Sequence, residues 1–177
     1  MHAIFRLIYN IIRNIILKLI NKERFICDTH CFISARTKVR IGKGKLELGK
    51  NVTIEKRGYV STSTGGQLKI GDNTFINENS HIGCRNEVYI GNDCIIGPNV
   101  SIYDHNHKFD NKRVYKNDYS LGEVHIGDGC WIGDGAKVLK GAIIGEGTII
   151  GAGVVVSGEI APHSIVKQGI NIIKCIE

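Results

Sequence analysis

The hydrophobic positions between residues 126 and 161 recur every six residues. Six consecutive hexads begin with an aliphatic side chain, at Ile126, Ile132, Val138, Ile144, Ile150 and Val156. A helix cannot gather these positions on one side, because a spacing of six at 100° per residue moves them around the cylinder. In a strand, side chains alternate between faces, so the fifth and first positions of neighbouring hexads point the same way. The fifth position is always Cys, Ala, Thr, Val or Ile, and the pattern therefore predicts short strands with one dry side.

Glycine follows the first aliphatic residue in four of these six hexads. Because glycine adopts positive φ without steric cost, we expect these positions to bend the chain between strands. Strands and bends that alternate every six residues are typical of a parallel β-helix, whose coils stack at ~4.8 Å. A less regular repeat covers residues 33–107, with a slip at 65–68 and a new register from Ile90. Together the repeats predict about six or seven coils.

Residues 3–20 have a different pattern, in which apolar residues recur at helical spacing and arginine, lysine and asparagine fall mostly opposite. This predicts an amphipathic helix. It is not a membrane span, because three cations and two asparagines interrupt a stretch that needs ~20 mostly apolar residues. Two interpretations stay open. Either the apolar face covers the first coil or packs on a neighbouring subunit, or residues 1–22 contact the inner face of an anionic membrane.

The repeat stops after His107, where the chain becomes rich in charge and tyrosine and loses its aliphatic ladder. We expect residues 108–125 to leave the coil as one long excursion loop, and loops on rigid scaffolds often carry function. The chain is accordingly divided into an N-terminal amphipathic helix (1–24), a coil (25–165) and a C-terminal tail (166–177).

The charge is concentrated at the N-terminus. Of a formal net charge of +6, residues 1–24 contribute five basic residues against one acidic residue. The rest is nearly balanced and offers no basic face for nucleic acid. The sequence shows no cleavable signal and no C-x-x-C motif, so we expect its six cysteines to be reduced, as in a cytoplasmic protein. Cys27, His30 and Cys31 lack a second ligand pair, so no metal is expected there.

His107 and Trp131 both occupy the sixth position of a hexad. By alternation with the inward first and fifth positions, both side chains are expected to point outward. An outward tryptophan implies a covering ligand or subunit, because it otherwise exposes a large apolar area.

From residue 77 to residue 157 the chain resembles the hexapeptide-repeat acyltransferases, and within them the galactoside, maltose and polysaccharide O-acetyltransferases. The hexads IGDGCW and IGDGAK and the outward His107 and Trp131 carry the resemblance. It implies a left-handed, three-sided β-helix assembled as a homotrimer. It further implies transfer of an acetyl group from acetyl-CoA to a sugar hydroxyl of a surface polysaccharide or its precursor, in the cytoplasm or at the inner face of the membrane.

The resemblance also assigns roles to individual residues. It puts His107 on the catalytic histidine and Asn77 on an asparagine near the acceptor hydroxyl. The expected cofactor-binding residues are Trp131, Gly133, Asp134, Ala152, Ser157 and Lys174. Asp134 stands where a serine usually offers its backbone amide, and Asn171 stands about where a proline is expected.

Two neighbours of His107 belong to the same hypothesis. Asp104 and His105 are expected in the acceptor pocket, and His105 stays open as an alternative general base, since Asp104 could orient either imidazole. An imidazole could take the proton from the acceptor hydroxyl and return it to the departing thiol. A backbone amide in the turn 133–135 could stabilise the oxyanion. This chemistry needs no metal.

Three other functions remain possible at this level. A γ-type carbonic anhydrase shares the coil and binds zinc through histidines, and His81, His105, His107 and His125 make it worth considering. Against it, the D-H-x-H spacing does not match that family, and its usual C-terminal helix is missing. An N-acetyltransferase of an amino sugar and a coil used only as an assembly platform are the other two.

Overall fold

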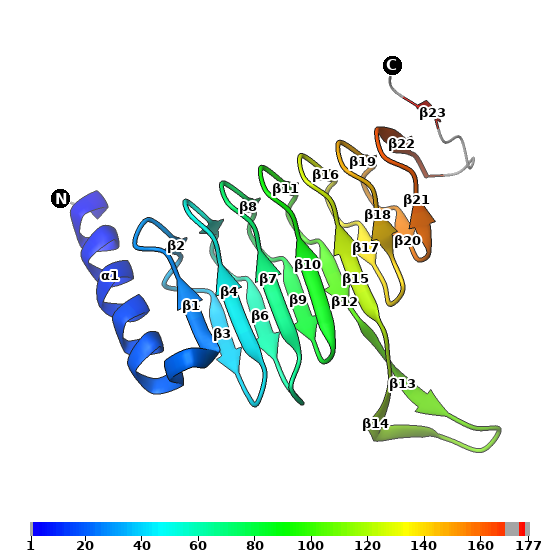
Figure 1. Ribbon diagram of the computed structural model, residues 1–177, viewed down its shortest axis with the longest axis horizontal. Helices are drawn as coiled ribbons and strands as arrows, with labels where there is room; N and C mark the ends of the chain where they lie inside the picture. Colours follow the sequence, from blue (N-terminus) through cyan, green and yellow to red (C-terminus); the bar gives the residue numbers. More distant parts are fainter. Residues whose placement is uncertain (1, 169–173, 176–177) are drawn as a thin grey trace.

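The coil is a left-handed β-helix with a helix at its N-terminal end (Figure 1). The computed structural model describes residues 2–168 and 174–175, with side chains for residues 7–168. In this part of the chain one α-helix, α1 (His2–Asn21), leads through a 3₁₀ turn, η1 (Lys22–Arg24), into strands. The predicted fold class is confirmed.

The strands of the coil form three sheets among the described residues, and all their pairings are parallel except that of β22 with β23. Sheet A contains β1 (Phe25–Cys27), β4 (Lys45–Leu48), β7 (Gln67–Ile70), β10 (Glu87–Ile90), β15 (Glu123–Ile126), β18 (Ile143–Ile144) and β21 (Glu159–Ile160). Sheet B contains β2 (Phe32–Ile33), β5 (Thr53–Ile54), β8 (Phe75–Ile76), β11 (Ile95–Ile96), β16 (Trp131–Ile132), β19 (Ile149–Ile150), β22 (Ser164–Val166) and β23 (Lys174–Cys175). Sheet C contains β3 (Lys38–Ile41), β6 (Tyr59–Thr62), β9 (His81–Cys84), β12 (Ser101–Tyr103), β17 (Lys137–Val138) and β20 (Val155–Val156). Successive strands visit the sheets in turn, so the coil is a three-sided prism.

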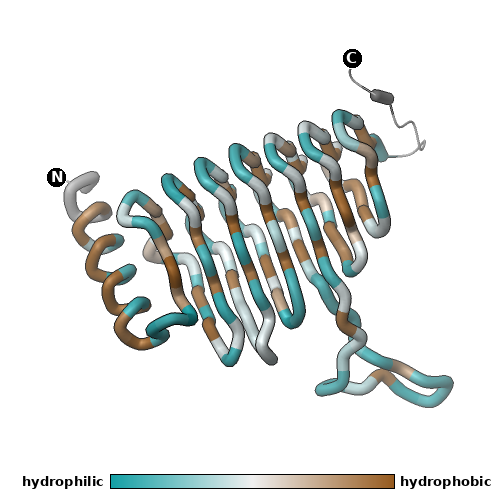
Figure 2. The backbone as a smooth tube through the Cα atoms, viewed as in Figure 1, coloured by the Kyte–Doolittle hydropathy of each residue, from teal (hydrophilic) through white to brown (hydrophobic). Residues whose placement is uncertain are grey.

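The interior is a stack of aliphatic ladders, and Figure 2 shows hydrophobic positions recurring in line from coil to coil. In sheet A the register places Ile70, Ile90, Ile126 and Ile144 in one column, and all four are buried. The fifth-position residues Cys94, Cys130, Ala136 and Thr148 are buried as well. The six-residue period therefore corresponds to the interior, as predicted.

The glycines that follow the aliphatic residues have a role other than the predicted one. The positive φ angles fall two residues later, for example at Gly129 (φ 65°) and Gly147 (φ 63°). At Gly133 the constraint is space, because a Cβ atom would lie 2.6 Å from the backbone nitrogen of Ala152 in the next coil. The expectation that these second-position glycines make the bends is wrong, and they instead allow consecutive coils to approach closely.

The excursion is an antiparallel hairpin of β13 (His105–Phe109) and β14 (Val114–Leu121). It leaves the prism at the corner between sheets C and A (Figure 1). The predicted bounds 108–125 are wrong at both ends, because the hairpin begins at His105 and Glu123–Ile126 is already strand β15 with Val124 buried. The backbone N–H of Gly122 donates to the carbonyl of Asp104 at 2.8 Å and closes the base of the hairpin.

Helix α1 covers the first coil mainly through its polar side, and Leu17 is a partly buried apolar residue of the helix that packs on the core. The amide of Asn10 donates to the carbonyl of Cys31 at 2.7 Å and accepts from the backbone N–H of Ile33 at 2.8 Å. The guanidinium of Arg13 donates to the carbonyls of Ser34 and Thr37. The interpretation that the apolar face covers the coil is therefore wrong. Within the described residues, no helix combines the length and hydrophobicity needed to cross a membrane.

Candidate functional site

The carboxylate of Asp104 is fully buried at the base of the hairpin. It accepts hydrogen bonds from the backbone N–H of Arg85 at 2.9 Å and from that of Asn86 at 2.7 Å, and Nδ1 of His105 lies 2.8 Å away. Burial opposes the charge, but the hydrogen bonds of His105, Asn86 and Arg85 outweigh it and hold the pKa of Asp104 below its ordinary value. Because this carboxylate is enclosed, it positions His105. The predicted role of Asp104 at the acceptor stays a prediction, and in this structure its carboxylate reaches the surface only through His105.

His105 lies between two tyrosine rings. The ring of Tyr103 meets it edge-on at 5.9 Å and that of Tyr119 at 5.4 Å, as distances between centroids. Gly83 leaves room for this packing, since a Cβ atom there would lie 2.8 Å from the Tyr103 ring. The His105 imidazole is 16% exposed. Its Nδ1 must carry the proton, because a carboxylate only accepts.

His107 is exposed on the same strand. Its Nδ1 lies 3.0 Å from the carbonyl oxygen of Tyr115 on β14, and since a carbonyl only accepts, Nδ1 is again the protonated nitrogen. The Tyr119 ring lies 4.6 Å from the imidazole, tilted by 40°. In the neutral imidazole Nε2 is then the basic nitrogen. The predicted outward direction of His107 is confirmed, although on the hairpin and not on the coil.

Tyr119 joins the two histidines, and the sequence reasoning missed it. It is the cross-strand partner of His107, it contacts both imidazoles, and the guanidinium carbon of Arg85 lies 3.5 Å above its ring centroid. Such a cation–π contact is favourable by about 0.5–2 kcal/mol and fixes the ring. The only hint in the sequence was the richness of the excursion in tyrosine.

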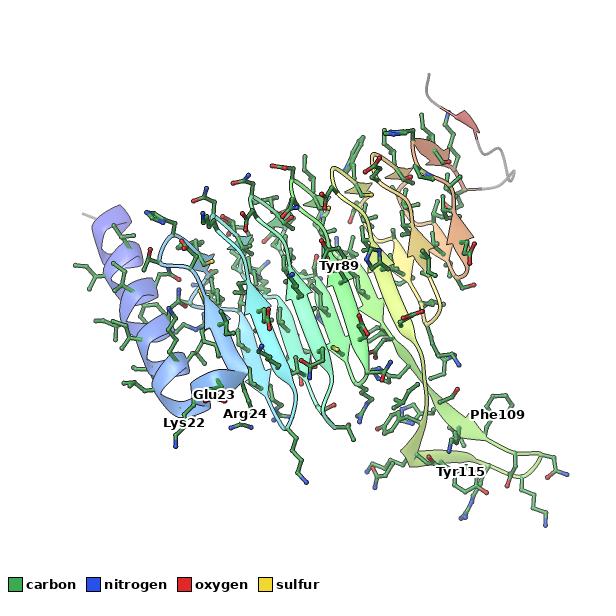
Figure 3. All side chains as sticks on the ribbon, in the orientation of Figure 1. Lys22, Glu23, Arg24, Tyr89, Phe109 and Tyr115 are labelled. Carbon is green, nitrogen blue, oxygen red and sulfur yellow. The ribbon has the colours of Figure 1, made fainter. Side chains whose placement is uncertain are left out.

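A shallow pocket lies beside His107 on the hairpin. It is lined by Asn106, His107, Lys108, Phe109, Ser120 and Lys140. The ammonium of Lys140 donates to the hydroxyl of Ser120 at 2.7 Å, which fixes a positive charge at the pocket. Figure 3 shows Phe109 and Tyr115 on the part of the hairpin that projects from the coil.

Trp131 lies on the outer face of sheet B. It is 51% exposed and pairs in register with Ile95 on one side and Ile149 on the other. The outward prediction for Trp131 is confirmed. With Phe75 these residues make an outer ladder of apolar side chains, which we call the sheet B ladder.

The turn after Trp131 leads from sheet B to sheet C. The backbone N–H of Gly133 donates to the carbonyl of Ile150 at 2.7 Å and that of Gly135 to the carbonyl of Pro98 at 2.9 Å. Within the described part of the chain, the backbone N–H of Asp134 has no hydrogen-bond acceptor. Of the three amides in this turn, Asp134 alone is therefore available to a ligand.

The remaining predicted residues are spread over the coil. Ala152 lies one coil above the turn 133–135 and is exposed, whereas Ser157 follows β20 at the corner between sheets C and A. Asn77 follows β8, and its side-chain oxygen accepts from the N–H of Glu78 at 2.8 Å. Lys174 lies in β23, but its side chain is outside the described part of the chain.

The two halves of the predicted site lie on different sides of the prism. His107 stands on the hairpin at the corner between sheets C and A, and Trp131 lies on sheet B, the side opposite that corner. One chain does not bring them together.

Metal ligands do not gather in the described residues, where no group of three His, Cys, Asp or Glu side chains could hold an ion. The thiols of Cys27 and Cys31 are buried and donate to backbone carbonyls, while His30 is exposed and pairs with Asp28. His125 stacks on Tyr89 at 4.5 Å on sheet A, apart from the hairpin histidines.

Two family models match the repeats. Residues 123–158 match the bacterial transferase hexapeptide (six repeats), and residues 67–104 match the hexapeptide repeat of succinyl-transferase. These segments flank the hairpin. Among curated proteins none is similar enough in sequence to count as a match.

Solved structures are similar in fold. A hexapeptide-repeat-containing acetyltransferase from Vibrio cholerae O1 biovar eltor, complexed with acetyl coenzyme A, is 26% identical with a TM-score of 0.55. The match covers 72% of this chain and 64% of that one, so the chain spans less than two thirds of its length. AntD, an N-acyltransferase from Bacillus cereus in complex with dTDP and 3-hydroxybutyryl-CoA, is 18% identical (TM-score 0.70, covering 84% of this chain and 80% of that one). The polySia-specific acetyltransferase NeuO is 19% identical (TM-score 0.57, covering 85% and 74%). AntD and NeuO indicate the fold alone, and the resemblance to hexapeptide-repeat acyltransferases is confirmed.

Proposed function

We propose that this chain, a hexapeptide-repeat β-helix, transfers an acetyl group from acetyl-CoA to a sugar acceptor. The observation that carries the proposal is the exposed imidazole of His107, whose Nδ1 is held by the carbonyl of Tyr115 at 3.0 Å. The match of residues 123–158 to the family model of the bacterial transferase hexapeptide supports it, as does the acetyl coenzyme A bound to the Vibrio cholerae acetyltransferase.

His107 acts as general base in this reaction. With Nδ1–H donating to the Tyr115 carbonyl, the lone pair of Nε2 accepts the proton of the acceptor hydroxyl as its oxygen attacks the thioester carbon. The resulting imidazolium then donates that proton to the departing thiolate, which balances the transfer. His105 is the second candidate, because its Nδ1 is held in the same way by Asp104.

The sheet B ladder fits coenzyme A. Its apolar surface around Trp131 suits the pantetheine arm, and the turn 133–135 lies directly after it. We assign the backbone N–H of Asp134 to the thioester oxygen, since its neighbours Gly133 and Gly135 already donate to carbonyls. Ala152, Ser157 and Lys174 remain the further proposed cofactor contacts, and Asn77 a proposed acceptor contact.

The site needs a second copy of the chain. Because His107 and the sheet B ladder lie on opposite sides of the prism, the imidazole of one subunit meets the thioester on the ladder of the next. In a closed ring of three prisms, the corner of each subunit that carries the hairpin contacts the sheet B ladder of the next subunit, and the same contact repeats three times. We therefore propose a homotrimer.

The acceptor group is a hydroxyl. Lys140 places a positive charge at the pocket beside His107, which disfavours binding of a protonated amino sugar. The aromatic rings on the hairpin suit the apolar faces of a sugar ring. We therefore propose O-acetylation of a polysaccharide sugar or its precursor, with N-acetylation as the alternative.

The test is release of free thiol from acetyl-CoA in the presence of a panel of sugars, amino sugars and glycan fragments. We expect turnover with hydroxyl acceptors, and coenzyme A binding that weakens at least about tenfold in Trp131→Ala. Val155→Ala, which also removes an exposed apolar side chain, serves as control. Absence of coenzyme A binding would overturn the proposal. Stoichiometric zinc with hydration of carbon dioxide would replace it with the anhydrase.

A further inference from the structure

Helix α1 exposes a broad apolar face. Four aliphatic pairs, at positions 7–8, 11–12, 15–16 and 19–20, are all exposed, and Leu19 reaches 73% and Ile20 67%. The pairs recur every four residues, so they lie along one side of the helix, which we call the apolar stripe. Figure 2 shows α1 as a largely hydrophobic element at the end of the molecule.

Covering the first coil does not use this stripe. The side of α1 that faces the coil is held by Asn10, Asn14 and Arg13, which donate to backbone carbonyls of residues 31–37. Both asparagines are buried. The helix could not turn its stripe inward without leaving these buried polar groups without partners, so the stripe is fixed outward.

The surroundings of the stripe are positively charged. The 20 residues of α1 include no Asp or Glu. Lys18 lies in its last turn, and Lys22 and Arg24 follow at its C-terminal end. Figure 3 labels Lys22 and Arg24 there, together with Glu23. Glu23 is the one acidic residue among the first 24.

These observations distinguish between possible partners. Pairing with a second α1 would bring the same cations close to each other, and the stripe is wider than the two-position seam of a coiled coil. A wide aliphatic face with basic flanks matches a helix that lies in the surface of an anionic bilayer. α1 does not cross the bilayer, because it falls short of the required hydrophobicity.

We propose that α1 binds the surface of an anionic lipid membrane through its apolar stripe, with the coil axis rising from that surface. The lipid chemistry required is an acyl layer for the stripe and anionic headgroups for Lys18 and Lys22, whereas the guanidinium of Arg24 donates to the carbonyl of Gly42 on the coil. This inference is independent of the proposed acetyl transfer.

The test is flotation of the purified full chain with vesicles. One set consists of phosphatidylcholine alone and the other contains about one third phosphatidylglycerol, a typical anionic lipid. We expect binding to the anionic set, weakened about fivefold for each charge removed in Lys18→Gln and Lys22→Gln and by high salt. The double variant Ile16→Ser/Leu19→Ser should lose binding to the anionic set, because it removes two members of the stripe.

The matched control is Ile143→Ser/Val155→Ser, which removes two exposed apolar side chains from the coil and should bind as the unchanged chain does. Circular dichroism of each variant checks that the fold is intact. Absence of binding by the unchanged chain, or equal binding by the Ile16→Ser/Leu19→Ser variant, would overturn the proposal. A third outcome would also overturn it. If the unchanged chain does not bind vesicles and the Ile16→Ser/Leu19→Ser variant has fewer subunits than the unchanged chain, the partner of the stripe is a second copy of the chain.

Discussion

Nδ1 of His107 lies 3.0 Å from the carbonyl oxygen of Tyr115, across the hairpin. The bond fixes the tautomer that a general base at Nε2 requires. Two residues earlier His105 has the same arrangement with Asp104, but its ring lies between two tyrosines. Exposure therefore favours His107 as the base.

Replacing His107 by alanine should abolish most of the activity and leave the fold intact. We expect thiol release to fall about 10²- to 10⁴-fold, the usual contribution of general base catalysis, with unchanged coenzyme A binding and subunit number. The control is His30→Ala, an exposed histidine on another part of the coil. An active His107→Ala together with an inactive His105→Ala would assign the base to His105.

Tyr119 should act through its ring and not through its hydroxyl. The ring contacts both imidazoles and the Arg85 guanidinium, whereas the hydroxyl donates only to the carbonyl of Lys116. We expect Tyr119→Phe to keep nearly full thiol release and Tyr119→Ala to lose about tenfold or more, because misplaced catalytic groups lower the rate steeply. Equal loss in both variants would show that the hydroxyl matters.

Asp104 should stabilise the fold in a pH-dependent way. In Asp104→Asn the side-chain NH₂ group faces the buried backbone N–H groups of Arg85 and Asn86. We expect the free energy of unfolding, measured in urea at neutral pH, to fall by about 2–4 kcal/mol. Because the folded-state pKa of Asp104 is lowered, its contribution is full above the unfolded pKa of about 3.9 and disappears as the pH falls through the folded value. The difference between the two proteins should therefore shrink in acid.

The control for this variant is Asp93→Asn, an exposed corner residue whose oxygen accepts from Asn73, since asparagine can accept the same bond. Its effect should stay within about 0.5 kcal/mol. A stability difference for Asp104→Asn that persists unchanged below the unfolded pKa would contradict an electrostatic cause.

The coil was predictable because its interior repeats. The first hexad position is filled by buried aliphatic residues, as Ile126 and Ile132 illustrate. The sequence therefore shows aliphatic residues every six positions, a spacing that is not found in helices. Ile90 pairs with Ile126 across a whole hairpin, so the register survives the interruption. The function of the second-position glycines was missed, because contact between coils is not visible in one repeat.

The arrangement around His107 was only partly predictable. Alternation gave the outward direction of the imidazole, but the partners Tyr115 and Tyr119 depend on how the hairpin strands pair. The face by which α1 is attached was also hidden, since an amphipathic pattern does not reveal which side is held. The end of the coil presents free backbone carbonyls, and asparagine and arginine satisfy these better than isoleucine does.

The attachment of α1 through its polar side can be tested at Asn10. Its amide makes two buried hydrogen bonds to the first coil, with Cys31 and Ile33. We expect Asn10→Ala to lower the free energy of unfolding by about 1–3 kcal/mol, measured in urea at one fixed protein concentration. The neighbouring Ile11→Ala removes an exposed side chain and should change it by no more than about 0.5 kcal/mol. A larger loss of unfolding free energy in Ile11→Ala than in Asn10→Ala would mean that the helix is held by its apolar side. Only in that case would Ile11 become buried on folding.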